Sequence, residues 1–253
     1  MSRYLADKRR TKLAELINDK GSFRVAELAD YFGVTKETIR KDLIYLDQQK
    51  LVCKTHGGAI SISESTERPV HMRSTENPEK KICIAKKALD FLADSKVAIL
   101  DSGSTVLHLA ELLTPNQCET LVTNSLPAAN ALAQKDMPFL WIGGEFSPIT
   151  MSTSGMAASQ TLNYITADVV FLGSSGFQSN TGPSAKAFCD AQIKRDMMKK
   201  SRTKIVLADS SKFVTNAFVR FADWSEIDYL ITDSDAPVDA LAELKKKIKI
   251  VIA

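Results

Sequence analysis

The spacing of hydrophobic residues changes along the chain, from helical periodicity in the first 60 residues to short continuous apolar runs after residue 80. The first part predicts a helix over about residues 4–19 and, over residues 24–46, two further helices joined by a tight turn. In the last of these, Ile39, Leu43 and Leu46 recur at i, i+4 and i+7 and give the helix one apolar face. We expect the three helices to share a small core.

The turn between the last two helices carries the local signals that such a turn needs. Gly33 stands where the chain leaves the first of them with a positive φ, which glycine adopts without a Cβ clash, and Thr35 can then cap the next helix. The outward face of that helix carries Lys36, Arg40 and Lys41. Such residues contact phosphates and base edges when a helix lies in a major groove, although a helical hairpin with a solvated charged face would show the same pattern.

A short β-rich segment follows these helices. Residues 51–60 read LVCKTHGGAI, in which a Gly-Gly turn separates two apolar stretches, and this favours a two-stranded wing behind a helix-turn-helix. The residues that we expect to contact DNA are Thr35, Lys36, Thr38, Arg40, Lys41, Lys54, His56, Gly57 and Gly58.

The rest of the chain has a different pattern, behind a connector expected over residues 61–79 that is rich in Ser, Glu, Arg and Pro. Predicted helices alternate with apolar runs, and continuous runs between helices are typical of strands that are buried on both faces. We therefore expect a DNA-binding domain over residues 1–60 and an α/β domain with a mainly parallel sheet over residues 80–253. The predicted strands are residues 97–101, 120–124, 139–144, 168–176, 204–211, 229–233 and 249–253.

Polar and small residues collect directly after five of these strands, in the sequences DSGST, TNS, GGE, GSSG and DSSK. Ligands of parallel α/β sheets bind beyond the carboxyl ends of the strands. Glycines let backbone N–H groups approach an anion, hydroxyls donate to its oxygens, and the predicted helix start at Ser104 adds a favourable dipole. Each loop alone could be an ordinary cap or turn, but five at one edge of a sheet favour a site for a phosphorylated ligand.

Several of these segments resemble a known family. GVTKETIRKDLIYL and KTHGGAI are similar to the N-terminal domain of the DeoR family of bacterial transcriptional regulators, and DSGST, TNS, GGE and ADSSKF are similar to its effector-sensing domain. The resemblance implies a winged helix-turn-helix and a second domain that resembles ribose-5-phosphate isomerase and CoA-transferase-like folds and binds phosphorylated sugars. The sequence departs from the family pattern at Lys50, where glycine is common, at Cys53, where arginine is common, and at Asp190, where glutamate is common.

Carried over to matching positions, the resemblance implies the following effector-binding residues: Asp101, Gly103, Ser104, Thr105, Thr123, Asn124, Gly143, Gly144, Lys194 and Lys212.

Charge and composition agree with two domains that have different roles. Residues 1–60 hold 12 Lys and Arg against 8 Asp and Glu, a net charge of +4, whereas the other 193 residues hold 21 against 22. The basic excess thus accompanies the predicted DNA-binding helices. The four cysteines and three histidines have no metal-ligand spacing, so we expect no metal and no other cofactor. With neither a signal peptide nor an apolar run near the ~20 residues of a membrane span, we expect a cytoplasmic protein that does not contact the membrane.

The function predicted from these patterns is sequence-specific transcriptional regulation, with repression of a carbohydrate catabolic operon relieved by a phosphorylated sugar. Its partners would be double-stranded operator DNA, the effector and further copies of the chain, because two half-sites require an oligomer. One alternative is a sugar-phosphate isomerase with an appended nucleic-acid-binding domain, for which Asp101, Glu145 and Asp209 supply acids. A second is a constitutive DNA-binding protein with a vestigial pocket. We favour a regulator without enzymatic activity.

Overall fold

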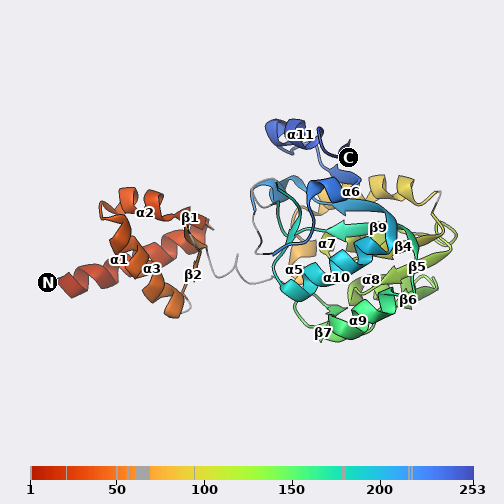
Figure 1. Ribbon diagram of the computed structural model, residues 1–253, viewed down its shortest axis with the longest axis horizontal. Helices are drawn as coiled ribbons and strands as arrows, with labels where there is room; N and C mark the ends of the chain where they lie inside the picture. The colour runs from red at the N-terminus through yellow and green to blue at the C-terminus, as the bar shows by residue number, and fades with distance from the viewer. Residues whose placement is uncertain are drawn as a thin grey trace. The chain divides into compact units, whose positions relative to one another are not determined.

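The computed structural model describes residues 2–20, 22–49, 51–55, 57–60, 69–93, 95–177, 181–215, 217 and 219–253. The chain divides into two compact units, Met1–Arg68 and Pro69–Ala253 (Figure 1). We call them the helical unit and the sheet unit.

The described residues of the helical unit form three helices and a small antiparallel sheet (Figure 1). Its elements are α1 (Ser2–Lys20), β1 (Ser22–Arg24), α2 (Val25–Phe32), α3 (Lys36–Gln48), β2 (Cys53–Lys54) and β3 (Gly58–Ile60). The strand order is β1-β3-β2. The predicted two-stranded wing therefore has a third strand, β1, which lies between α1 and α2 in the chain. Leu13, Leu28 and Leu43, one from each helix, are fully buried in the shared core.

The turn between α2 and α3 has the predicted local structure. Gly33 has a φ of 62° at the end of α2, in the left-handed region that a side chain would strain. The Thr35 hydroxyl accepts a hydrogen bond from the Thr38 backbone N–H at 3.2 Å and caps α3. Ile39, Leu43 and Leu46 are buried, which confirms the apolar face predicted for this helix.

The sheet unit contains a seven-stranded sheet in the order β14-β13-β11-β9-β4-β5-β6, and all of its strand pairs are parallel. The strands are β4 (Val97–Leu100), β5 (Thr120–Thr123), β6 (Phe139–Trp141), β9 (Ala167–Gly173), β11 (Ser201–Leu207), β13 (Tyr229–Thr232) and β14 (Lys249–Ile252). The predicted α/β fold with a mainly parallel sheet is confirmed.

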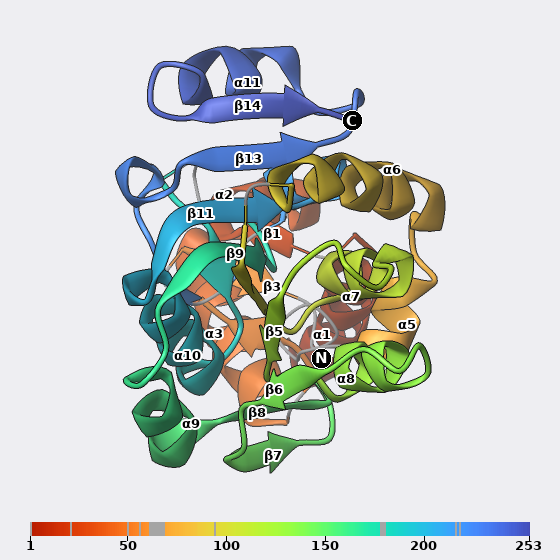
Figure 2. The same ribbon diagram turned by 90° about the vertical axis from the view of Figure 1, so that its right-hand side faces the viewer.

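Helices cover both faces of this sheet (Figure 2). Alternate residues along β4 point to opposite faces, so Ala98 and Leu100 belong to the core on the side of α6, α7 and α8, while Ile99 belongs to the core on the side of α9, α10 and α11. The helices are α5 (Val70–Ser74), α6 (Pro78–Ala88), α7 (Ser104–Leu112), α8 (Leu126–Ala133), α9 (Gly155–Leu162), α10 (Phe188–Lys199) and α11 (Val238–Leu244). Short helices η1 (Leu89–Phe91), η3 (Ser210–Phe213) and η4 (Trp224–Glu226) complete them.

Two antiparallel strand pairs in the described part of the sheet unit lie outside the large sheet and have no counterpart in the predicted strands. They pair β7 (Glu145–Ser147) with β8 (Ser152–Ser154) and β10 (Ser184–Ala185) with β12 (Val219–Arg220). With two or three residues each, these strands are too short to show an alternating pattern in the sequence.

The structure also differs from prediction at the end of the expected connector. Residues 69–79 contain α5 and the start of α6, and they contact the sheet unit: Val70 is buried, and its backbone N–H donates to the carbonyl of Ile149 at 3.1 Å. Within the described part of the chain, no helix has the length and apolar character needed to cross a membrane.

Candidate functional site

The second helix of the helix-turn-helix, α3, presents the predicted basic face to solvent. Lys36, Arg40 and Lys41 are exposed, and Arg40 makes only a long contact of 3.4 Å with the exposed carboxylate of Glu37. An ion pair of this kind contributes little to stability, so the guanidinium remains available to a nucleic acid. Thr35 is exposed as well, and Thr38 is partly buried beside it.

The inward face of α3 carries a buried acid that anchors the helix to α1. Asp42 is 1% exposed, and its two carboxylate oxygens accept hydrogen bonds from Arg9 Nε at 2.6 Å and Arg10 Nε at 2.8 Å. The Arg10 guanidinium also lies 4.0 Å from the centre of the Tyr45 ring. Both oxygens of this carboxylate are satisfied by α1, so we assign Asp42 the role of fixing the orientation of the recognition helix.

The two glycines of the wing have different surroundings. A Cβ at Gly58 would lie 2.0 Å from the carbonyl oxygen of Phe23, because β3 passes directly against β1, whereas a Cβ at Gly57 would meet nothing within 4 Å. Gly58 is buried and Gly57 is exposed. Lys54 is exposed, with its backbone N–H bonded to Asp47, and His56 lies outside the described residues.

In the sheet unit, the carboxyl end of β4 brings together the two predicted effector residues Asp101 and Lys194. Lys194 Nζ forms an ion pair with Asp101 Oδ2, which also accepts a hydrogen bond from the Gly173 backbone N–H at 2.9 Å. Asp190 adds a second carboxylate 3.6 Å from Lys194 Nζ. Burial opposes the charged form of Lys194, but the two carboxylates outweigh it and raise the pKa of the lysine, so its ammonium stays charged.

Among the described residues, Thr232 Oγ1 at the end of β13 and three buried acceptor oxygens at this edge have no hydrogen-bond partner. The three acceptors concern the candidate site. They are Asp101 Oδ1, Asn124 Oδ1 and Asp209 Oδ2, which follow β4, β5 and β11. A buried acceptor without a donor is costly, and such groups are rare in folded proteins. A ligand with hydroxyl groups would supply the missing donors.

Sequence reasoning missed two cations next to this edge, Arg73 and Lys81. Lys81 is 2% exposed, and its Nζ donates to the carbonyl oxygens of Arg73 and Glu76 at the end of α5. Burial lowers the pKa of Lys81 to about 8; the carboxylate of Asp209 opposes this shift, whereas the ammonium of Lys212 adds to it. The signal in the sequence was a lysine on an apolar stripe, since Lys81 precedes buried Ile84, Ala85 and Ala88 at helical spacing.

Other predicted effector residues lie at the same edge but support the fold. Thr123 Oγ1 donates to the carbonyl oxygen of Leu100 at 2.8 Å, and Asn124 Nδ2 donates to that of Thr153 at 2.8 Å. Ser104 and Thr105 are buried in the first turn of α7, behind Gly103, and Lys212 lies partly buried in η3.

Gly143 and Gly144 follow the edge strand β6, which is separated from β4 by two strand spacings, roughly 10 Å, and from β11 by four, roughly 19 Å. A Cβ at Gly144 would lie 2.4 Å from the carbonyl oxygen of Ser154, so close packing against β8 explains this glycine. We therefore place the centre of the candidate site at the ends of β4, β9 and β11.

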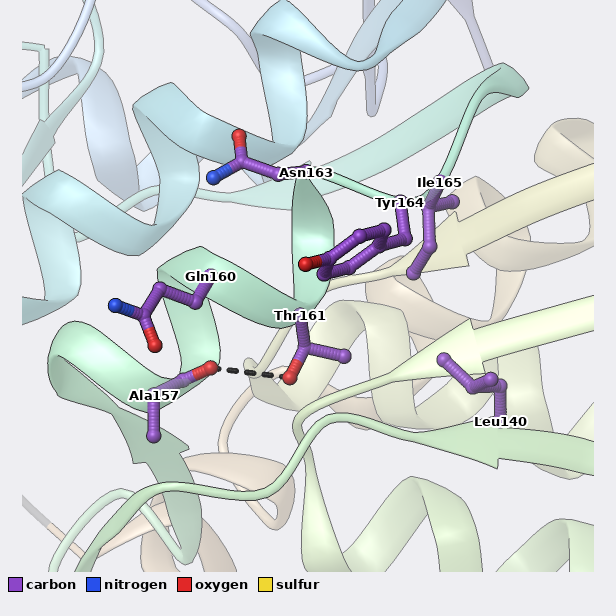
Figure 3. Close-up of a pocket in the computed structure, with 7 residues that line it drawn as sticks. All are labelled: Leu140, Ala157, Gln160, Thr161, Asn163, Tyr164 and Ile165. Carbon is purple, nitrogen blue, oxygen red and sulfur yellow. Dashed lines mark hydrogen bonds between the residues drawn. The ribbon is translucent and has the colours of Figure 1, made fainter.

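A separate cavity of about 740 Å³ lies between α9 and the edge strand β6 (Figure 3). Its lining is uncharged, and the Thr161 hydroxyl is bonded to the carbonyl of Ala157 within α9 at 3.0 Å. None of the predicted effector residues lines it; the lining residues are Leu140, Ala157, Gln160, Thr161, Asn163, Tyr164 and Ile165. The lining therefore has no cation to balance the charge of a phosphate. Among the described residues, no group of three or more His, Cys, Asp or Glu could hold a metal ion.

Solved structures that match this chain include ribose 5-phosphate isomerase A from Methanocaldococcus jannaschii, with 18% identity, a TM-score of 0.42 and coverage of 55% of this chain and 56% of that one. The full-length sorbitol operon regulator SorC from Klebsiella pneumoniae matches with 12% identity and a TM-score of 0.40 over 94% of this chain and 99% of that one.

Sequence comparisons identify both units. Residues 9–65 match the DeoR-like helix-turn-helix domain, and residues 76–234 match the DeoR C terminal sensor domain. The HTH-type transcriptional regulator YulB of Bacillus subtilis, itself uncharacterized, is 34% identical over 96% of each chain. The glycerol-3-phosphate regulon repressor of Escherichia coli K12 is 31% identical over 93% of this chain and 94% of that one. The chain therefore belongs to the DeoR family of transcriptional regulators.

Proposed function

We propose that this protein represses a carbohydrate catabolic operon and is released from its operator by a phosphorylated sugar. The exposed basic face of α3 would read the operator, with Arg40 and Lys36 contacting base edges and phosphates. Relatives named as repressors of the glycerol-3-phosphate regulon and, putatively, of the aga operon support repression of a carbohydrate operon. Two half-sites on the DNA would be bound by a homo-oligomer.

The observation that carries the effector half of the proposal is the set of unpaired buried acceptors beside buried cations. Asp101 Oδ1, Asn124 Oδ1 and Asp209 Oδ2 need donors, while the buried ammonium of Lys81 gains from a nearby anion. A phosphorylated sugar meets both requirements, since its hydroxyls donate and its phosphate is negative. Free phosphate would satisfy only the cations, and a free sugar only the acceptors.

We also propose that the protein binds this ligand without converting it. A general base must be able to accept a proton from the substrate. Asp101 Oδ2 is held by Lys194 and the Gly173 N–H, which leaves Oδ1 to accept a hydrogen bond from a ligand hydroxyl. An arrangement of this kind can orient a sugar, and the relatives named above are regulators.

A thermal-shift screen of the full chain tests the effector half of the proposal. The panel would contain glycerol 3-phosphate, ribose 5-phosphate, fructose 1-phosphate and glucose 6-phosphate, each beside its unphosphorylated parent and beside inorganic phosphate. At least one phosphorylated sugar should raise the melting temperature of the sheet unit more than its parent does, because it binds only the native state. Equal shifts for each pair, or turnover of a panel member, would contradict the proposal.

The regulatory half requires an operator, which selection from a random duplex library would provide. Arg40→Ala should weaken binding to the selected duplex by about tenfold or more. Lys212→Ala should bind the duplex normally but need more of the active sugar phosphate for release, whereas Lys245→Ala, an exposed lysine at the end of α11, should behave as wild type in both assays. Normal release of Lys212→Ala would exclude Lys212 from the effector site.

A further inference from the structure

The two edges of the large sheet differ sharply in charge. At the β14 edge, residues 238–253 form α11 and β14 and hold six charged residues in 16. At the opposite edge, residues 137–165 form β6, β7, β8 and α9 and hold one charged residue, Glu145, in 29. Charged residues make up 25% of the whole chain. Figure 2 shows these two edges at opposite ends of the sheet unit.

The edge with few charges exposes large apolar side chains. Tyr164 is 93% exposed just after α9, and Met156 is 76% exposed in its first turn. α9 buries Ala158 and Leu162 in the core and contacts β7 and β8. Interface cores are depleted in charge and rich in aromatic residues and methionine. Five exposed side chains make up this surface, which we call the apolar edge: Leu140, Phe146, Ile149, Met156 and Tyr164.

Leu140 and Tyr164 also border the cavity between β6 and α9, so the apolar edge is hollowed where these two elements meet (Figure 3). The one charged side chain of this edge, Glu145, lies against its own chain. A Cβ at Gly155, the first residue of α9, would lie 3.0 Å from the carboxylate carbon of Glu145. The exposed apolar surface therefore has a groove in it and little charge around it. Apolar surfaces of this kind mark sites of association.

The strand β6 adds an open backbone edge to this surface. It ends the seven-stranded sheet, and among the described residues it pairs with β5 alone. An unpaired edge strand can bind a further strand, and many proteins prevent this with charged side chains, lysine above all. The β14 edge has this protection, because Lys249 lies in the strand and residues 245–247 before it are lysines. β6, with the sequence FLW, has none.

We propose that the apolar edge is the surface through which two sheet units associate, and that the partner is a second copy of this chain. The inference rests on the proposed function, which requires a homo-oligomer, and it assigns the surface that forms it. An uncharged surface meets no like-charge repulsion from its own copy, whereas it offers a charged partner no complementary group. Around a two-fold axis the same surface faces itself, and β6 finds its hydrogen-bonding complement in an antiparallel β6.

Sedimentation equilibrium of the full chain tests this assignment. Wild type should have the mass of two chains or a multiple of it. Tyr164→Glu and Met156→Glu place a carboxylate on a surface that faces its own copy, and each should raise the dissociation constant for self-association by about a hundredfold or more. Tyr164→Phe keeps the apolar ring and should associate as wild type does. Val238→Glu, at a residue that is 79% exposed on the opposite edge, is the matched control and should also associate normally.

Binding to the selected operator duplex extends the test to DNA. Tyr164→Glu should bind a duplex with two half-sites about a hundredfold more weakly than wild type, because each DNA-binding unit would then bind alone. Its melting temperature should still rise with the active sugar phosphate, since the substitution lies away from the candidate site. Circular dichroism would show that both glutamate variants, at positions that face water in the single chain, remain folded.

The outcomes separate this inference from the proposed function. A pure wild-type chain that stays monomeric would overturn the second copy as the partner, and glutamate variants that associate like wild type would overturn the surface. In either case, operator binding and its release by a sugar phosphate still decide the proposed function. Dissociation of Val238→Glu alone would move the interface to the β14 edge. Dissociation of Tyr164→Phe would contradict an apolar contact, because only the hydroxyl is lost.

Discussion

The two units each contain a buried aspartate paired with cations, and the two sites differ in what is left unsatisfied. In the helical unit, each oxygen of Asp42 accepts from an arginine of α1. In the sheet unit, Oδ2 of Asp101 pairs with Lys194 and accepts a hydrogen bond from the Gly173 N–H. Its other oxygen, Oδ1, has no donor among the described residues. A completed pair fixes a structure, whereas an incomplete pair leaves a group for a ligand to satisfy. Burial of charge alone thus does not distinguish a structural site from a binding site.

The largest effect should come from breaking the pair in the sheet unit. Lys194→Met leaves the buried carboxylate of Asp101 without its cation and should cost about 3–5 kcal/mol of unfolding free energy. Trp141 and Trp224 both lie in the sheet unit, so urea unfolding followed by tryptophan fluorescence reports on it directly. Lys199→Met, an exposed position on the same helix, should cost less than about 1 kcal/mol. Similar losses for the two variants would mean that the buried pair is not needed for stability.

The second largest effect should come from ligand binding, which should stabilise the sheet unit that contains Asp101 but not the helical unit that contains Asp42. At a concentration of about one hundred times its dissociation constant, the active sugar phosphate should stabilise the sheet unit by about 2.7 kcal/mol. The helical unit, whose carboxylate is already satisfied, should gain nothing. Unfolding followed by tryptophan fluorescence and by far-ultraviolet circular dichroism would separate the two responses. Stabilisation of the helical unit alone would reverse the assignment of the binding site.

Breaking the Asp42 pair should have a smaller effect than breaking the Lys194 pair. Arg9 and Arg10 are 21% and 25% exposed, so water reaches their guanidinium groups when the carboxylate is removed. Asp42→Ala should therefore cost about 1–3 kcal/mol, seen as earlier loss of helical circular dichroism with an unchanged tryptophan transition. Glu37→Ala, which removes an exposed carboxylate from the same helix, is the matched control and should cost less than about 0.5 kcal/mol. Equal effects would show that Asp42 does not fix α3.

The smallest expected effect is the change in affinity for the sugar phosphate with pH. Burial lowers the pKa of Lys81 to about 8, so the charged lysine costs stability below that pH, and the cost disappears as the pH rises toward the ordinary pKa of 10.5. A bound phosphate favours the charged form, and affinity for the sugar phosphate should therefore be full below pH 8 and fall as the pH rises through it. The carboxylates of Asp209 and Glu76 and the cations Arg73 and Lys212 set this value.

Calorimetry at about pH 7 and about pH 9 would measure a loss of at most about tenfold in wild type, because one pKa unit corresponds to a tenfold change. A phosphate monoester has its second pKa near 6, so its own charge is constant over this range. Lys81→Arg keeps its charge and should show no such loss. A wild-type affinity that does not change with pH would remove Lys81 from the neighbourhood of the bound phosphate.

The sequence predicts those parts of the protein whose cause is local. Gly33 and Thr35 specify the turn before α3 from their own backbone and side-chain chemistry, and the apolar runs identify the seven strands of the large sheet. The strand β1 was not predicted, since Ser22–Arg24 is extended only because it pairs with β3, about 35 residues later in the chain. The strands β10 and β12 were missed for the same reason, since they pair across more than 30 residues, whereas β7 and β8 are too short to show a pattern.

In the candidate site too, some residues could be predicted from local motifs, whereas others are brought into place only by packing. Asp101 and Lys212 stand in motifs beside strand ends, Lys194 was named from the family resemblance, and the roles of all three as effector ligands remain predictions. Residues 69–79 look like a connector in the sequence, and only their contacts show that α5 and the start of α6 pack within the sheet unit. Asp42 and Lys81 share a signal that is readable in advance: each is a charged residue on the apolar stripe of a helix.

The Gly57–Gly58 pair has a consequence for sequence variation in the wing. A side chain at position 58 would collide with the Phe23 carbonyl oxygen and push β3 away from β1, whereas position 57 has open space around it. In a saturation library scored for repression in cells, position 58 should accept glycine alone. Position 57 should accept many amino acids, and those retained there would reveal which chemistry the DNA backbone prefers at the tip of the wing.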